Sequence, residues 1–417
     1  MPRFNIPRSF VSLITRQRRS NWSLFFGWFV ALSLSCVIPV RAMDLRGFVE
    51  VEGRPFFTSA NFPRQKDHTI SLAVNPEVFH KFDNGAQFYF IPFFRYDHSD
   101  KERTHFDLRE LDFIFSGDFW SARLGVRKVF WGVTETQHLV DIINQTDFLE
   151  GLDGEDKLGQ PMMNVSLVQD WGILDFYVLP FFRERTFAGR GGRLRPPFLV
   201  DTDNSRYESS TEEWHTDFAV RYFQNIEKWD VGLSFFSGTS REPTFDPGLS
   251  SLGEPVLIPL YEQIEQAGLD LLYVYGNWIW KLETIYRWGM RPEDYFASTF
   301  GFEYTFSGIF GSGMDLGLLT EWSYDERKEL ASTGLQNDIA AGVRWGLNDI
   351  NGTEILVALI QDLEGPSKSF FIEASARLNE HWRLSLEARG FFDQPDDDPF
   401  IFLRDEDFAQ ISLAYHF

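Results

Sequence analysis

The sequence of 417 residues has one cysteine, few basic residues for its length and a single long apolar run. One thiol can form neither an internal disulfide nor a zinc–thiolate cluster, so both are excluded. Lys and Arg number 39 against 61 Asp and Glu and form no basic tract, which disfavours nucleic-acid binding because neutralising phosphates needs clustered positive charge. Beyond the N-terminus, no apolar run is long enough for a membrane-spanning helix. Aromatic residues are abundant at 17% of the chain, which excludes a disordered protein.

The N-terminal region has the composition of an export signal. Residues 1–42 contain six Arg and no acid, residues 22–40 are almost wholly apolar, and Val40-Arg41-Ala42 provides a small-residue cleavage site. This order of basic, apolar and small residues predicts a secretory signal peptide at 1–42 and a mature domain at 43–417. The alternative is an uncleaved helical anchor. Cleavage would also remove Cys36, which suits an oxidising compartment.

From Leu45 onward the dominant hydrophobic period is two, which is typical of strands with one apolar face. In 313–324, for example, Leu316, Leu318 and Trp322 alternate with Gly317 and Glu321. Eighteen such segments follow one another, at 45–52, 68–80, 86–97, 104–115, 119–131, 162–170, 173–183, 214–224, 229–238, 265–275, 278–288, 296–306, 313–324, 337–347, 353–362, 370–378, 382–391 and 407–417.

The connections between these segments alternate in length. Even-numbered connections are mostly very short, whereas odd-numbered ones are mostly long, at 53–67, 132–161, 184–213, 239–264, 325–336 and 392–406. A tilted strand of roughly 9–11 residues crosses a bilayer, and short turns on one rim with long loops on the other are typical of outer-membrane barrels. The sequence therefore predicts an all-β fold, a transmembrane antiparallel up-and-down β-barrel of about 18 strands, in the outer membrane of a Gram-negative bacterium. Trp120, Trp229, Trp278 and Trp382 each follow a short turn, where an interfacial aromatic girdle would lie.

The last segment alternates apolar and polar residues and ends on Phe417. It resembles the C-terminal signature of Gram-negative outer-membrane proteins. That resemblance implies recognition by the barrel-assembly machinery, and the location implies contact with outer-membrane lipid and lipopolysaccharide.

The strand faces opposite the apolar ones would line the barrel, and they carry nearly balanced charge. Such a wall either sets up a transverse electric field across an aqueous pore or stabilises a plugged barrel through paired charges. Barrels of about 16–18 strands usually leave an aqueous channel. The strand residues that we consider as pore candidates are Arg95, Arg123, Arg127, Arg221, Lys281, Glu283 and Arg344.

The long connection 132–161 is the candidate constriction, a loop that folds into the barrel. Its pore candidates are Asp141, Asn144, Asp147 and Glu150, and we expect its acids to face Arg123 and Arg127 across the pore. The alternative is a lid packed outside the mouth. A second long connection, 184–213, carries several arginines that either recruit an anionic solute or bind lipid phosphates.

One stretch carries a family resemblance. Arg123-Leu-Gly125 leads to Trp131-Gly132 and then to an Asx-rich segment from Asp141 to Asp147. This resembles porin-type and alginate-exporter-like families over about 30 residues. The resemblance implies passive passage of a small hydrophilic solute or export of an anionic polysaccharide.

We therefore predict a passive channel without a cofactor or a resident metal. The alternatives are a polysaccharide exporter, a plugged structural or adhesive barrel, and an outer-membrane enzyme. Catalysis is disfavoured because none of the eight His lies in a local motif with a Ser or a paired acid, and no His-x-x-x-His pair is present.

Overall fold

The computed structural model describes residues 43–417 except 332, 397 and 399. The predicted signal peptide, and its alternative of a helical anchor, fall on residues 1–42 and so lie outside the described residues. In the part of the chain that the structure describes, no helix is long and apolar enough to cross a membrane.

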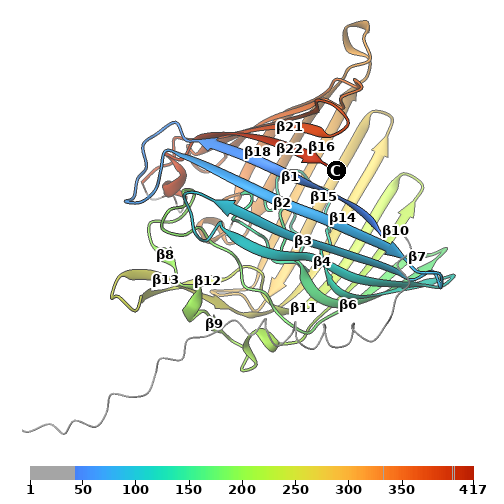
Figure 1. The fold of residues 1–417 in the computed structure, drawn as a ribbon, viewed down its shortest axis with the longest axis horizontal. Helices are drawn as coiled ribbons and strands as arrows, with labels where there is room; N and C mark the ends of the chain where they lie inside the picture. The colour runs from blue at the N-terminus through green and yellow to red at the C-terminus, as the bar shows by residue number, and fades with distance from the viewer. Residues whose placement is uncertain (1–42, 332, 397, 399) are drawn as a thin grey trace, which may run out of the picture. The chain divides into compact units, whose positions relative to one another are not determined.

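Eighteen antiparallel strands form one closed sheet. β1 (Asp44–Pro55) pairs with β2 (His68–Lys81) along one edge and with β22 (Phe408–His416) along the other, so the first and last strands lie side by side in Figure 1. The other barrel strands pair in chain order: β3 (Gln87–Asp97), β4 (His105–Ser116), β5 (Trp120–Arg127), β6 (Gln160–Gln169), β7 (Gly172–Leu179), β10 (Asp217–Ile226), β11 (Trp229–Thr239), β14 (Gln263–Tyr275), β15 (Trp278–Trp288), β16 (Tyr295–Phe306), β17 (Asp315–Asp325), β18 (Asn337–Gly346), β19 (Glu354–Asp362), β20 (Lys368–Arg377) and β21 (Trp382–Phe392). The prediction of an 18-stranded up-and-down barrel is confirmed.

The period of two becomes an outward apolar face and an inward polar face. In β17, Leu318 and Trp322 are 41% and 42% exposed on the outside, whereas Glu321 and Ser323 are buried on the inside. Trp229 and Trp382 open β11 and β21 at the short-turn rim with their rings exposed. An apolar outer wall with aromatic side chains at its rim is the surface that a bilayer solvates.

The regular pairing of β3 with β4 is interrupted by one bulge. Ile91 pairs with Glu110 and Pro92 pairs with Leu108, so Arg109 has no partner across the ladder. Proline lacks an N–H for the ladder, and a bulge with one extra residue re-aims the side chains around it. The bulge leaves Arg109 buried inside the barrel.

The structure differs from the predicted segments mainly at the long-loop end, and the strand expected at 173–183 ends at Leu179. The strand expected at 119–131 ends at Arg127, because the chain from 128 turns into the barrel. The long connections 184–213 and 239–264 contain a second small sheet at the long-loop end (Figure 1), made of β8 (Leu199–Val200), β9 (Arg206–Tyr207), β12 (Thr244–Leu249) and β13 (Pro255–Tyr261). The helical turns of the described residues are 3-10 helices: η1 (Thr202–Asn204), η2 (Glu212–Trp214), η3 (Ile309–Gly311), η4 (Lys328–Leu330) and η5 (Ile401–Leu403).

Candidate functional site

The connection between β5 and β6, residues 128–159, crosses the lumen and is held by the far wall. There the carboxylate of Glu283 on β15 accepts hydrogen bonds from the backbone N–H groups of Val133 at 2.6 Å and Thr134 at 3.0 Å. The Thr134 hydroxyl donates to the same carboxylate at 2.7 Å, and the N–H of Val140 donates at 3.2 Å. Glu283 is fully buried, so water does not compete for these donors. We call residues 128–159 the lumen loop.

A second wall carboxylate holds the next residues of the lumen loop. Glu321 on β17 accepts from the N–H groups of Glu135 and Thr136, both at 2.8 Å, and from the Thr136 hydroxyl at 2.8 Å. The Gln137 amide then donates to the Thr299 hydroxyl on β16 at 2.8 Å. Four consecutive backbone N–H groups are therefore fixed by two acids of the opposite wall.

The Trp-Gly pair at the start of the lumen loop explains its approach to the wall. Gly132 has φ +143°, and a Cβ at this position would lie 2.8 Å from Oε1 of Glu283. Trp131 is buried, its ring meets that of Tyr177 edge to face with centroids 5.6 Å apart, and the Arg221 guanidinium lies 5.1 Å from it. The tryptophan thus anchors the loop while the glycine admits the carboxylate.

The lumen loop fills one side of the barrel with apolar side chains. Its buried Val129, Trp131, Val140, Ile142 and Ile143 pack in one cluster with inward residues of β6, β7, β10, β11, β14, β15 and β16. The wall members of this cluster include Met162, Tyr177, Leu179, Ala219, Phe236, Ile264, Ile285, Tyr295 and Ala297. This side of the lumen is therefore occupied by packed side chains.

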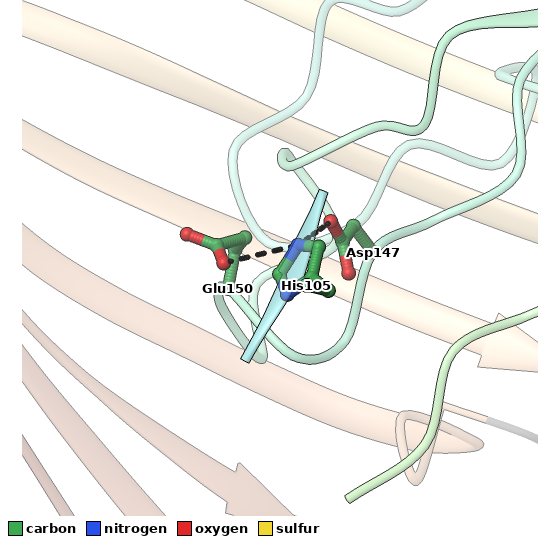
Figure 2. Close-up of side chains that lie close together, drawn as sticks. All are labelled: His105, Asp147 and Glu150. Carbon is green, nitrogen blue, oxygen red and sulfur yellow. Dashed lines mark ion pairs between the residues drawn. The ribbon is translucent and has the colours of Figure 1, made fainter. Parts of the chain in front are cut away.

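The returning half of the lumen loop forms ion pairs with β3 and β4. Nη2 of Arg109 lies 2.7 Å from Oδ2 of Asp147, and Nη2 of Arg95 lies 2.8 Å from Oε2 of Glu150. Figure 2 shows His105 between the two acids, with its Nε2 3.6 Å from a carboxylate oxygen of each. Burial acts to raise the pKa of Asp147, but His105 and Arg109 hold it well below its ordinary value.

His105, Asp147 and Glu150 are also the group among the described residues whose ligand atoms lie close enough to hold a metal ion. The Asp147 oxygen nearest His105 already accepts from Arg109 at 2.7 Å, and the Glu150 oxygen nearest His105 accepts from Nε of Arg95 at 3.0 Å. A divalent cation would therefore lie beside two guanidinium groups. The geometry favours an ion-pair network over a metal centre.

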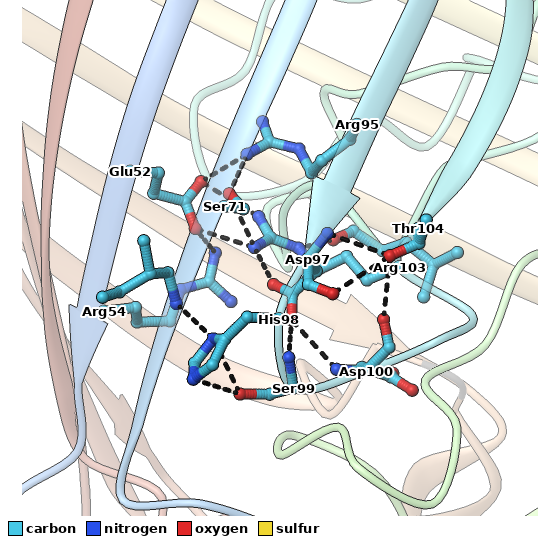
Figure 3. A network of polar contacts seen from close by, with 12 residues as sticks. Glu52, Arg54, Ser71, Arg95, Asp97, His98, Ser99, Asp100, Arg103 and Thr104 are labelled. Carbon is cyan, nitrogen blue, oxygen red and sulfur yellow. Dashed lines mark hydrogen bonds and ion pairs between the residues drawn. The ribbon is translucent and has the colours of Figure 1, made fainter.

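This network continues towards the long-loop rim (Figure 3). Arg103 lies 2.8 Å from Glu52 and 3.0 Å from Asp97, while Arg95 lies 3.0 Å from Glu52 and donates to the Ser71 hydroxyl at 2.6 Å. Burial acts to lower the pKa of Arg103, but the Glu52 carboxylate raises it above its ordinary value. Charges buried this deeply are stable only when paired, so this side of the lumen is braced.

The lumen loop also closes on itself. Asp141 lies 3.1 Å from Lys157, and the Asn144 amide bridges the two ends of the loop. Its Oδ1 accepts from the N–H of Val129 at 2.8 Å, and its Nδ2 donates to the carbonyl of Leu158 at 2.8 Å. These contacts fix the loop's width.

The expectation that loop acids face Arg123 and Arg127 is not met. Asp147 and Glu150 pair instead with the arginines of β4 and β3 described above, and Asp141 pairs with Lys157 of the loop itself. Arg127 donates to Asn164 at 3.0 Å, and only its backbone carbonyl contacts the lumen loop, through Asn144 at 2.9 Å. Arg123 makes no hydrogen bond or ion pair with any described residue, and its charged neighbours are Arg127 and two acids of β4. The bulge in β4 brings Arg109 into the place that Arg123 and Arg127 were expected to take.

The other basic candidates lie on the far wall. Arg344 on β18 lies 2.7 Å from Glu135 of the lumen loop, and Lys281 on β15 lies 3.6 Å from the same acid. Arg221 pairs with Asp270 on β14 at 2.8 Å and reaches the loop only through the ring of Trp131.

The wall of β20 and β21 carries accessible polar side chains. Arg389 lies 2.6 Å from Glu387, 3.3 Å from Glu373 and 3.1 Å from Asp153 of the lumen loop. The Glu373 side chain is 44% exposed, and Arg383, nearer the short-turn rim, is also exposed. The Arg389–Asp153 pair thus spans from wall to loop beside an accessible polar strip.

A histidine at the tip of the loop is sensitive to pH. Nε2 of His138 lies 3.8 Å from Glu155. Burial acts to lower the pKa of His138, but Glu155, Glu283 and Asp141 together raise it above its ordinary value. His138 is therefore more readily protonated than a free histidine.

Sequence reasoning did not select Arg109, Glu321 or Arg389 as pore candidates. Alternation does place Glu321 and Arg389 on inward faces, so that signal was available for both. Arg109 alternates in phase with the buried Asp107, but it lies at the bulge, beyond which the phase of β4 changes, so alternation along the strand gives no single facing for it.

Known proteins give little further information. No family model and no curated protein matches the chain. Among solved structures, two engineered variants of Rhodopseudomonas blastica porin, one of them a triple mutant, match with 13% identity and a TM-score of 0.44, over 90% of this chain and 100% of theirs. A similarity this weak has no bearing on the solute or the mechanism.

Proposed function

We propose that the protein is an outer-membrane channel of the porin type, through which small hydrophilic solutes diffuse passively beside the lumen loop. The supporting observation is the accessible strip on β20 and β21, narrowed by the pair between Arg389 and Asp153. A cavity of about 670 Å³ lies on the long-loop side of this pair and is bounded by both residues. A solute would enter this cavity, pass the pair and leave along the strip towards Arg383. The lumen loop acts as a fixed filter because its backbone is hydrogen-bonded to the wall.

The location and the assembly partner belong to the same proposal. The apolar outer wall suits the outer membrane of a Gram-negative bacterium, with lipopolysaccharide at the long-loop rim. Phe417 exchanges two hydrogen bonds of 3.1 Å with Gly47, so the C-terminal residue takes part in closing the barrel. Binding of this last strand by the barrel-assembly machinery would therefore be coupled to closure of the barrel between β22 and β1.

A plugged structural barrel is the second candidate. It is favoured by the apolar cluster and the ion-pair network, which together occupy much of the lumen.

Single-channel recording separates the two functions. The mature chain, residues 43–417, is refolded in detergent, shown to be folded by heat-modifiable migration, and inserted into a planar bilayer. Stable ohmic steps are expected from a channel. A folded barrel that inserts and remains silent would contradict the channel and support the plug.

A further inference from the structure

The cavity above the lumen loop has an unusual lining for a pore that passes only polar solutes. Its volume of about 670 Å³ falls in the range of small-molecule sites, roughly 300–1,000 Å³. Aromatic rings are the prominent lining groups, among them Phe148, Phe187, Phe198, Phe245, Phe371 and Phe391. The rings of Phe187 and Phe245 meet edge to face with centroids 5.7 Å apart, and Phe245 is 43% exposed. A further ring can extend such a pair.

Each acid that lines this cavity has a partner in the protein. Asp325 lies 2.7 Å from Arg327, and the other acids with a Lys or Arg partner are Asp97, Glu135, Asp141, Asp153, Glu242 and Glu373, of which Asp153 and Glu373 share Arg389. Glu155 lies 3.8 Å from His138, and Asp100 accepts from the N–H of Gly189 at 2.8 Å. These carboxylates are therefore already engaged by other groups of the protein.

Two arginines of the same lining lack a carboxylate. Arg185 donates from Nε to Gln145 at 3.2 Å and stacks over Phe148 at 4.8 Å, and neither Nη atom has a hydrogen-bond partner among the described residues. Arg195, only 8% exposed, donates to two backbone carbonyls and stacks over Phe62 at 4.5 Å, while its buried Nε has no partner. Neither arginine forms an ion pair within the described part of the chain.

An uncompensated guanidinium beside a cavity is a site for an anion. Burial lowers the pKa of both Arg185 and Arg195, and the nearest carboxylates, Glu242 for Arg185 and Asp100 and Glu406 for Arg195, offset this only in part. Arginine nevertheless stays protonated in proteins, so the missing partner must come from water or from a ligand. The planar guanidinium matches a carboxylate in a bidentate fashion, and the neighbouring rings suit an apolar body.

We propose that the cavity binds small amphipathic carboxylates, with the carboxylate on Arg185 and an aromatic or aliphatic body against Phe148, Phe187 and Phe245. Arg195 supplies a second positive group in the same lining. This inference rests on the proposed channel function, since it names the class of solute that the channel favours.

Equilibrium binding tests the site independently of conduction. Full-length protein is expressed, purified from membranes in detergent and titrated calorimetrically with benzoate, benzamide and acetate. Benzamide has the shape of benzoate without the charge, and acetate has the charge without the ring. Benzoate is expected to bind at least about tenfold more tightly than either, because a hydrogen-bonded ion pair and ring burial both contribute.

The variants locate the carboxylate. Arg185→Gln is expected to weaken benzoate about tenfold or more, and Arg185→Lys, which keeps the charge but loses the fork, is expected to weaken it less. Arg206→Gln is the matched control, because Arg206 follows in the same connection, is exposed and pairs with Asp246 at 2.9 Å. Equal binding of benzoate and benzamide, or unchanged benzoate binding by a folded Arg185→Gln variant, would overturn the proposal. Benzoate binding by a barrel that does not conduct would support this site and contradict the channel instead.

Discussion

Removal of the Glu283 carboxylate should release the lumen loop from the wall. Glu283→Ala leaves three backbone N–H groups, those of Val133, Thr134 and Val140, without their acceptor. Each buried donor left without an acceptor destabilises the docked loop by about 1–3 kcal/mol. Water that enters the vacated space can hydrogen-bond to these donors, so the cost of each is at the lower end of this range. The three donors together then amount to about 3 kcal/mol, and since each 1.4 kcal/mol is a factor of ten, the released loop should become roughly a hundredfold more populated.

The assay is single-channel recording of the folded variant in a planar bilayer. Release of the loop should appear as a larger conductance level or as frequent transitions to one. Adding Glu321→Ala, which removes the second acceptor, should increase the time spent at that level. Glu77→Ala is the control, because Glu77 lies at the short-turn end of β2 and hydrogen-bonds Arg46 at 2.6 Å. Conductance and current noise that stay at wild-type values in the folded double variant would refute the anchoring role of these carboxylates.

Two further predictions concern charge and pH. Arg389→Ala leaves the acids around Arg389 without their cation, so the reversal potential in a salt gradient should shift towards cation selectivity. Arg123→Ala should leave the reversal potential nearly unchanged. An equal shift in both variants would show that Arg389 does not line the narrow point. The pKa of His138 is higher in the folded protein than in the unfolded chain, where it is about 6.5. Protonated His138 therefore stabilises the folded loop fully at pH values below the unfolded-state pKa, and this contribution is lost as the pH rises through the folded-state pKa. Current noise from loop motion should therefore increase towards alkaline pH in the wild type and much less in His138→Gln, and identical pH profiles would exclude this histidine.

The way the loop is anchored bears on whether it could open and close the proposed channel. Its contacts with Glu283 and Glu321 are mainly through backbone N–H groups, so they depend on the wall acids more than on which side chains the loop carries. Gating by the loop would require several buried hydrogen bonds to open together. In the proposed channel, these contacts therefore favour a fixed loop over a swinging gate.

Much of the barrel could be predicted from the sequence because each strand carries its own signal. The alternation in segments such as 313–324 records a local requirement, one face towards lipid and one towards the lumen, which needs no knowledge of distant residues. The lengths of the connections also predicted which rim has short turns and which has long loops, again from local sequence alone. The prediction failed where local phase is broken: the bulge at Arg109 shifts the register, and the strand at 119–131 ends early because Val129 and Trp131 turn into the lumen.

The sequence by itself determined that this chain is a closed barrel with an apolar outside and a mostly polar inside, because the number of strands and the facing of their side chains follow from a period of two. Only the tertiary structure decided the path of the lumen loop and the partners of its acids. The contact between Thr134 and Glu283 joins residues 149 positions apart, and a backbone N–H donor has no residue-type signature. Such contacts depend on which strands face each other across the closed barrel, and that geometry exists only once the chain has folded.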